Sequence, residues 1–172
     1  MSAITITDRI YNVLFLCTGN SARSVMAEAL LNVLGQGRLH AYSAGSHPGG
    51  MVQPMAAKLA ADIGYDTRQL RSKSWDEFMG PNVPEMDLVI TVCANAAGES
   101  CPVWLGSPTT AHWGVDDPAA VHGDEETRQR AYLIAFAILR RRVELLVALP
   151  LEKLDQLATQ QQVRAIGAAG AT

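Results

Sequence analysis

Four short apolar runs of strand length are spaced along the chain, and segments of helical periodicity lie between and after them. The runs are Asn12–Leu16, Leu39–Ser43, Leu88–Val92 and Thr109–Trp113. Strands that alternate with helices predict an α/β protein whose parallel sheet carries helices on both faces. In such sheets, ligands bind beyond the carboxyl ends of the strands, where the strand order reverses. We therefore expect functional residues directly after these runs.

The last long helix has the clearest apolar stripe. Its core-facing residues are Tyr132, Phe136, Leu139, Val143 and Leu146. The charged residues expected on its solvent face are Arg140, Arg141, Arg142 and Glu144. Earlier helices are predicted at 26–34, ending at Gly35, and from Pro54 to Gly64. From Pro150 onward we expect a further helix and a frayed tail of small residues, so the chain divides into a domain at 1–149 and an extension at 150–172.

Composition and charge exclude several classes of function. The chain has 172 residues, 48% of them hydrophobic, which is enough for one well-packed domain. Its net charge of −3 offers nothing to attract nucleic acid, and no apolar run approaches the roughly 20 residues of a membrane span. The start, MSAITITDRI, lacks the features of a secretory signal, so we expect a cytoplasmic protein without nucleic-acid or membrane partners. Its three cysteines would stay reduced there, which favours reactive or buried thiols over structural disulfides.

The sequence CTGNSARS separates the first predicted strand from the first helix. A loop at a helix start directs several backbone N–H groups inward, and the helix dipole adds positive potential. Gly19 and Asn20 tolerate the left-handed backbone that a tight turn requires, and Arg23 can offer a bidentate fork to a tetrahedral anion. Cys17 would lie at the centre, where a helix N-terminus and a cation lower the pKa of a thiol from about 8.5 to roughly 3.5–7.5. Ser24 could cap the helix or donate its hydroxyl to that thiolate.

The spacing of Cys17 and Arg23 alone would be weak evidence, because unpaired cysteines are commonly buried as small hydrophobes. The strand before the loop, the helix after it and the small polar residues within it favour an oxyanion site. Its residues would be Cys17, Thr18, Gly19, Asn20, Ser21, Ala22, Arg23 and Ser24.

CTGNSARS resembles the signature of the low-molecular-weight tyrosine phosphatase fold, and especially of the thioredoxin-coupled arsenate reductases built on it. The likeness covers roughly residues 11–149. It implies a three-layer α/β sandwich with a four-stranded parallel sheet. It also implies Cys17 as nucleophile and Arg23 with the loop amides as ligands of arsenate or phosphate, with no cofactor. Ala22 departs from the pattern, since many such reductases carry a second cysteine there, so any redox relay must use other thiols.

A covalent intermediate on Cys17 needs a proton for its leaving oxygen, and Asp116 and Asp117 are the candidate acids. Pro118 restricts the residue before it to extended conformations, which fixes the direction of the Asp117 side chain. The resemblance likewise implies the aspartate directly before the proline. We therefore predict Asp117 as the general acid, the alternatives being Asp116 and a merely acidic turn.

Reduction also needs electrons, for which Cys93 and Cys101 are the candidates. If the first and third strands are neighbours, a spacing of roughly 5 Å brings Cys93 near Cys17. Cys93 could then attack the Cys17–arsenic adduct and release arsenite, and Cys101 could resolve the resulting disulfide by exchange. The placement of the pair resembles the thioredoxin-coupled reductases, which implies thioredoxin, or glutaredoxin with glutathione, as the reductant. A packed cysteine after a strand and a cysteine in a turn are the alternatives.

Other residues give weaker signals. The four histidines are scattered without ligand spacing, so no metal site is expected. SAGSHPGG (43–50) could form a rim of the pocket or a plain surface loop. Arg71 and Lys73 could add positive potential near the site, although we expect them in a solvated loop. Three functions stay open at this point: arsenate reduction, phosphomonoester hydrolysis by Cys17, Arg23 and Asp117, and non-catalytic oxyanion sensing.

Overall fold

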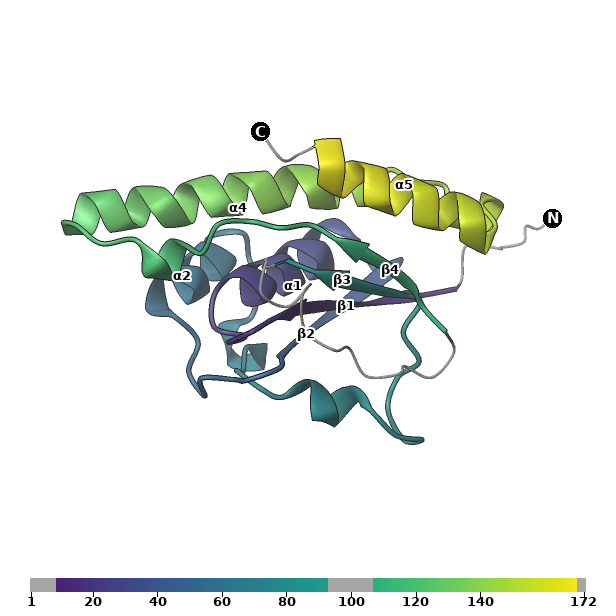
Figure 1. The fold of residues 1–172 in the computed structure, drawn as a ribbon, viewed down its shortest axis with the longest axis horizontal. Coiled ribbons are helices and arrows are strands. Elements are labelled where there is room, and N and C mark those ends of the chain that lie inside the picture. Colours follow the sequence, from purple (N-terminus) through teal and green to yellow (C-terminus); the bar gives the residue numbers. More distant parts are fainter. Residues whose placement is uncertain (1–8, 93–106, 170–172) are drawn as a thin grey trace.

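The computed structural model describes residues 9–92 and 107–169, and its centre is a four-stranded parallel sheet (Figure 1). The strands are β1 (Tyr11–Cys17), β2 (Leu39–Gly45), β3 (Leu88–Thr91) and β4 (Thr109–His112). Their order is β2-β1-β3-β4, so the strand order reverses beside β1. The predicted α/β fold with a four-stranded parallel sheet is confirmed, and each predicted strand is present to within two residues at either end.

Helices and short 3-10 turns cover the two faces of the sheet unequally (Figure 1). The helices are α1 (Arg23–Leu34), α2 (Pro54–Asp62), α4 (Glu125–Val147) and α5 (Gln156–Ala169). The 3-10 turns are η2 (Thr67–Gln69), η3 (Trp75–Phe78), η4 (Pro118–Ala120) and η5 (Leu151–Lys153). Within the described part of the chain, α1, α4 and α5 share the larger core, whereas η3 packs against the opposite face.

Strand β1 shows how the sequence divides between the two cores. Val13 and Phe15 belong to the larger core, Leu14 and Leu16 belong to the smaller one, and all four are fully buried. Successive side chains of a strand point to opposite faces, so a strand covered on both sides reads as a continuous apolar run. The uninterrupted run NVLFL fits the position of β1 in the structure, where it lies between β2 and β3.

Helix α4 carries the predicted stripe, but one of its arginines does not face solvent as expected. Asp124 caps the helix by accepting a hydrogen bond from Thr127 N at 2.8 Å. All five stripe residues are buried, and so is Arg142, which is 1% exposed. Position 142 follows Leu139 by three residues, which places it on the same helical face. Arg142 donates from Nη1 to the carbonyl oxygen of Gly114 at 3.0 Å.

Helix α5 confirms the helix predicted after Pro150 and packs closely on β4, but it continues through Ala169 into the small-residue segment where fraying was expected. Val163 and Ile166 belong to the larger core, and the indole of Trp113 donates to Val163 O at 2.9 Å. At Gly167 a Cβ atom would lie 2.4 Å from the carbonyl oxygen of His112, so only glycine permits this approach. The boundary at residue 149 stays a prediction, although α5 contributes to the same core as the strands. None of the helices in residues 9–92 and 107–169 has the length and hydropathy needed to span a bilayer.

Candidate active site

Cys17 is the last residue of β1 and lies at the carboxyl edge of the sheet. It pairs in register with Gly45 of β2, and on the other side Val92 N donates to Leu16 O at 2.8 Å. The expectation that the first and third strands are neighbours is therefore confirmed. Cys93 and Cys101 themselves lie outside the described residues.

The loop between Cys17 and α1, which we call the oxyanion loop (17–23), turns its carbonyl groups outward. Four of these carbonyls accept hydrogen bonds from the backbone of the neighbouring segment 46–53. The pairs are Ser46 N to Cys17 O at 3.3 Å, His47 N to Thr18 O at 2.9 Å, Gly49 N to Gly19 O at 3.1 Å and Gln53 N to Ser21 O at 2.8 Å. In a trans peptide the C=O and the following N–H point in opposite directions, so the following amides face into the loop. Segment 46–53 therefore lies along the outer side of the loop, and a role of 43–50 as a rim of the pocket stays a prediction.

The thiol of Cys17 lies inside this loop, 3% exposed, with two polar groups close to the sulfur. Asn20 N donates to Sγ at 3.3 Å, and Ser24 Oγ lies 3.1 Å from it. Asn20 has a φ of 48°, the left-handed backbone predicted for this position. Ser24 does not cap α1, whose N-cap residue is Ala22 without a side-chain bond, so the contact with the sulfur is the alternative that the structure supports.

The direction of donation around Ser24 follows from the amide of Asn20. Asn20 Oδ1 accepts from Lys73 N at 2.9 Å, which orients the amide so that Nδ2 donates to Ser24 Oγ at 2.8 Å and to Ser43 Oγ at 3.0 Å. Because Ser24 Oγ accepts this bond, its own proton is available for the sulfur of Cys17. Two donors directed at one sulfur favour the thiolate over the thiol.

Arg23 reaches from the first turn of α1 to the segment that follows β4. Its Nη1 donates to Val115 O at 2.9 Å, and its Nη2 lies 3.5 Å from Asp117 Oδ2. The Arg23 side chain is 13% exposed and that of Asp117 is 40% exposed, so the carboxylate stays in contact with solvent. Asp117 Oδ1 also accepts from Ala119 N at 3.0 Å, whereas Asp116 is exposed. Of the two predicted acids, Asp117 is therefore the one held beside the arginine of the loop.

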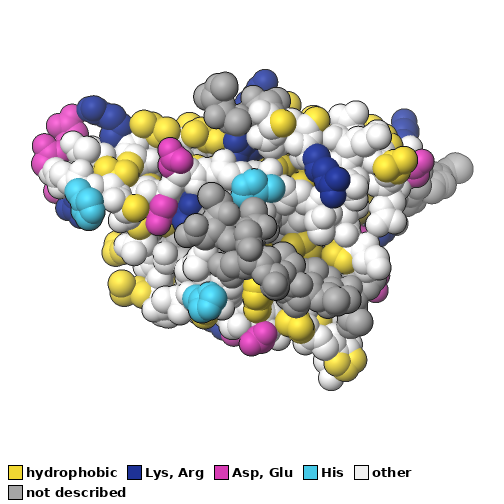
Figure 2. Space-filling view, in the orientation of Figure 1, with side chains coloured by type: hydrophobic (Ala, Val, Ile, Leu, Met, Phe, Trp, Pro, Cys, Tyr) yellow, Lys and Arg dark blue, Asp and Glu magenta, His cyan; other side chains and the backbone are white. Residues whose placement is uncertain are grey.

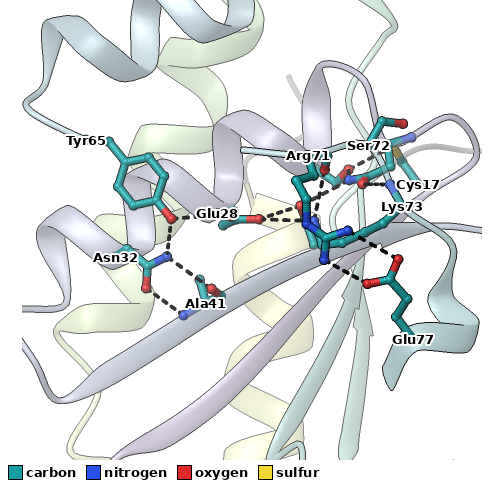
Figure 3. Close-up of polar contacts among 12 residues, drawn as sticks. Cys17, Glu28, Asn32, Ala41, Tyr65, Arg71, Ser72, Lys73 and Glu77 are labelled. Carbon is teal, nitrogen blue, oxygen red and sulfur yellow. Dashed lines mark hydrogen bonds and ion pairs between the residues drawn. The ribbon is translucent and has the colours of Figure 1, made fainter. Parts of the chain in front are cut away.

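A buried carboxylate, Glu28, lies behind the oxyanion loop and was missed in the sequence (Figure 3). It is 5% exposed and accepts from Ser43 Oγ at 2.6 Å and from Tyr65 Oη at 2.9 Å. Burial raises the pKa of Glu28, and burial together with the charge of Glu28 raises the pKa of Tyr65. The sequence did contain a signal for its burial. Glu28 lies four residues after Ser24 and three before Leu31, so it shares the inward face of the helix with them.

Lys73 approaches the same carboxylate and corrects the expectation of a solvated loop. Its ammonium lies 3.9 Å from Glu28 Oε1, and its side chain is 7% exposed. Burial lowers the pKa of Lys73, and the nearby charge of Glu28 opposes this shift. Arg71 behaves as expected of a surface residue, since it forms an exposed ion pair with Glu77 at 2.7 Å.

Gly45 allows β2 to pass directly beneath the oxyanion loop. A Cβ atom at Gly45 would lie 2.5 Å from Thr18 O and 3.1 Å from Asn20 N, so a larger residue would displace the loop backbone. Gly45 N also donates to Lys73 O at 2.9 Å. Both neighbours of the loop, β2 and the segment around Lys73, are thus joined to each other as well as to the loop.

Figure 2 shows the basic side chains of the described residues dispersed among acidic and neutral ones. Within residues 9–92 and 107–169, no group of three or more His, Cys, Asp or Glu side chains could hold a metal ion.

Comparison with known proteins places this site in a family. A model of the low molecular weight phosphotyrosine protein phosphatases matches residues 12–164. The chain belongs to this family. Curated relatives of this phosphatase-family chain include proteins named arsenate reductase from Halalkalibacterium halodurans and Bacillus subtilis. Each is 38% identical over 116 residues, which cover 67% of this chain and 80% of theirs.

Solved structures agree with this membership of the phosphatase family. An arsenate reductase in the phosphate binding state superposes with a TM-score of 0.62 and 26% identity, covering 81% of this chain and 98% of that one. An arsenate reductase from Archaeoglobus fulgidus has a TM-score of 0.56 and 32% identity, covering 77% and 98%. The predicted resemblance is therefore confirmed for both the family and the fold.

Proposed function

We propose that this chain is an arsenate reductase that converts arsenate to arsenite through an adduct on Cys17. The observation that carries the proposal is the buried Cys17 sulfur, with Asn20 N–H and the Ser24 hydroxyl within hydrogen-bonding distance and Arg23 at the start of α1. A thiolate held at a helix N-terminus is a competent nucleophile. The names of the relatives favour reduction over hydrolysis.

The first step is attack of the Cys17 thiolate on arsenic, with arsenate held by the loop amides and the guanidinium of Arg23. An As–O bond breaks, and Asp117 donates the proton that lets this oxygen leave as water. Thr18, Gly19, Asn20 and Ala22 would supply the inward amides. The 3-10 turn that follows Asp117 contains only Pro118, Ala119 and Ala120, so it provides small walls suited to an inorganic anion and no aromatic ring for a phenol.

The second step transfers two electrons from sulfur to arsenic. The thiolate of Cys93 attacks the Cys17 sulfur, the S–As bond breaks with its electron pair staying on arsenic, and As(V) leaves as As(III) in arsenite. Cys101 then attacks the Cys17–Cys93 disulfide, which frees Cys17 and leaves a Cys93–Cys101 disulfide. Thioredoxin, or glutaredoxin with glutathione, would return both thiols in the cytoplasm. The roles of Cys93 and Cys101 rest on the sequence alone.

A single-turnover reaction tests this function. Fully reduced protein is mixed with arsenate in the absence of any other thiol, arsenite is quantified, and disulfides are mapped by mass spectrometry. We expect one arsenite per chain and a Cys93–Cys101 disulfide, no product from Cys17→Ser, and one turnover from Cys101→Ala before it stalls. Continued turnover of Cys101→Ala with a small thiol would show that an external thiol resolves the intermediate directly.

Phosphomonoester hydrolysis is the second candidate, because the matching family is one of phosphatases and Cys17, Arg23 and Asp117 would serve both reactions. It predicts rapid release of phenol from phenyl phosphate while all three thiols stay reduced. Binding of arsenate or phosphate without either product would leave oxyanion sensing as the function.

A further inference from the structure

Arg142 of α4 is an unusual residue for the interior of this domain. It is 1% exposed, and its Nε atom is buried without a hydrogen-bond partner among residues 9–92 and 107–169. Burial lowers the pKa of the guanidinium, and no carboxylate in the described part of the chain offsets that effect. Burying a cation without a counter-ion is costly, so a side chain of this kind calls for a specific reason.

The contact of Arg142 lies in the short segment that leads from β4 to Asp117. Arg142 Nη1 donates to Gly114 O at 3.0 Å, and Arg23 Nη1 donates to the next carbonyl, Val115 O, at 2.9 Å. Two guanidinium groups from different helices, α4 and α1, therefore hold consecutive carbonyls of one segment. Arg23 is in addition 3.5 Å from the carboxylate of Asp117, two residues further on.

The same segment is anchored from its other neighbours. Val115 N donates to Val92 O at 2.9 Å, and a Cβ atom at Gly114 would lie 2.8 Å from Nε2 of His112. The imidazole of His112 thus lies against Gly114 on one side, and the carbonyl of Gly114 accepts from Arg142. A shift of the Gly114 carbonyl would therefore lengthen or break its hydrogen bond to Arg142.

We propose that Arg142 is a positioning residue that holds the 114–117 segment so that Asp117 meets the leaving oxygen of the adduct on Cys17. The inference rests on the proposed role of Asp117 as general acid. Arg142 touches neither the sulfur nor the anion, so it acts only through the segment. A displacement of about 1 Å in a proton donor can reduce a rate about 100-fold, which makes the hold on Gly114 relevant to catalysis.

A double-mutant cycle between Arg142 and Asp117 tests this inference. Arg142→Gln, Asp117→Asn and the double variant are compared in the single-turnover release of arsenite and in the hydrolysis of phenyl phosphate. We expect Arg142→Gln to slow the reaction about 10- to 100-fold in the wild-type background and less than about 2-fold when Asp117→Asn is present, since the acid is then already lost. Arg142→Lys should recover part of the rate, because an ammonium can still donate to Gly114 O.

Two controls separate positioning from a general loss of structure. Arg141 is the exposed neighbour on α4, and Arg141→Gln should leave both rates unchanged. Alkylation of the Cys17 thiol should proceed at the same rate in Arg142→Gln and wild-type protein, because the loop and Ser24 are untouched. The limb of the pH–rate profile that reports the acid should be lost in Arg142→Gln and kept in Arg141→Gln.

Equal slowing by Arg142→Gln in both backgrounds would overturn the inference, as would a wild-type rate for Arg142→Gln. If Arg142→Gln does not fold, Arg142→Met carries the same cycle, because methionine keeps an unbranched stem but cannot donate to Gly114 O. An unchanged rate and pH profile for Arg142→Met would also count against positioning. Failure of the proposed reductase function can be told apart from failure of the positioning role. In that case the wild-type protein forms no arsenite, and the double-mutant cycle is measured with phenyl phosphate instead. If Asp117→Asn has no effect in either reaction, the acid role and the positioning role are both refuted.

Discussion

Replacing Lys73 with methionine removes the ammonium that faces Glu28, together with its hydrogen bond to the carbonyl oxygen of Arg71 at 2.9 Å. The two charges are 3.9 Å apart and both side chains are 7% exposed. The hydroxyl groups of Ser43 and Tyr65 would still donate to the carboxylate at 2.6 and 2.9 Å. Because methionine has an unbranched stem of similar length, the substitution tests the charge rather than the packing.

The expected loss of stability follows from the distance and the burial. At 3.9 Å, two unit charges attract by about 4 kcal/mol when the effective dielectric constant is about 20. Desolvation opposes this attraction, which is why the pKa of Glu28 is raised and that of Lys73 lowered despite the pairing. Removing one partner leaves the other charge buried and uncompensated, at a cost of about 3–5 kcal/mol. We expect Lys73→Met to lower the free energy of unfolding by about 3 kcal/mol at neutral pH.

The loss should depend on pH in a defined direction. Without Lys73, the pKa of Glu28 rises further above its ordinary value of 4.5, so the folded state binds a proton more tightly than the unfolded state does. The stability that comes from this proton is fully present below 4.5 and is lost as the pH rises through the folded pKa. Lys73→Met should therefore lose less stability at pH 5 than at pH 8.

Urea denaturation followed by circular dichroism at pH 5, 7 and 8 measures these differences. Arg71→Met is the matched control, because it breaks an exposed ion pair with Glu77 in the same segment and should cost less than about 1 kcal/mol. In the Glu28→Gln background, Lys73→Met should cost much less than alone, since no buried carboxylate remains. A loss that is independent of pH, or the same loss with and without Glu28→Gln, would refute the reasoning.

Three further changes test the local geometry. Gly45→Ala places a Cβ atom 2.5 Å from Thr18 O and so forces the loop backbone to move. Bound arsenate should slow the alkylation of Cys17, and in this variant the arsenate concentration needed to do so should rise at least 10-fold. An unchanged concentration would contradict the close approach at Gly45. Gly167→Ala places a Cβ atom 2.4 Å from His112 O and should lower the free energy of unfolding in urea by about 1–3 kcal/mol. An unchanged free energy of unfolding would show that α5 can move away from β4 without loss. Asp124→Ala removes the cap of α4 and should lower the midpoint of urea denaturation, whereas Asp124→Asn should lower it less.

Much of the fold was predictable because its signals are local. The run NVLFL, the helical period that ends at Gly35 and the stripe on α4 each depend on neighbours within one element. The oxyanion loop was predictable for the same reason, since Cys17, Asn20 and Ser24 come from one turn and the start of its helix. The contact of Ser24 with the sulfur was one of two alternatives that the sequence left open.

The wrong expectations concern charged residues whose burial depends on distant partners. Arg142 shares a helical face with Leu139, but it is buried only because Gly114 offers a carbonyl there. Lys73 lies in a loop and was expected to be solvated, but its side chain is buried because Glu28 lies opposite it. Similarly, α5 is held by a close approach at Gly167 that no periodicity indicates. The relay through Cys93 and Cys101 stays a prediction.

The hydrogen bonds around the oxyanion loop explain how an anion could bind there without rearrangement. The outward carbonyls are already paired with segment 46–53, the amide of Asn20 is oriented by Lys73 N, and Arg23 is held at Val115 O. None of these bonds has to break for the inward amides to meet an oxyanion. Dipoles that are fixed before the substrate arrives need no reorganisation during the reaction, which is the most effective form of electrostatic catalysis. Substitutions that loosen these supports, such as Gly45→Ala, should therefore reduce the rate even though they leave every reacting group in the protein.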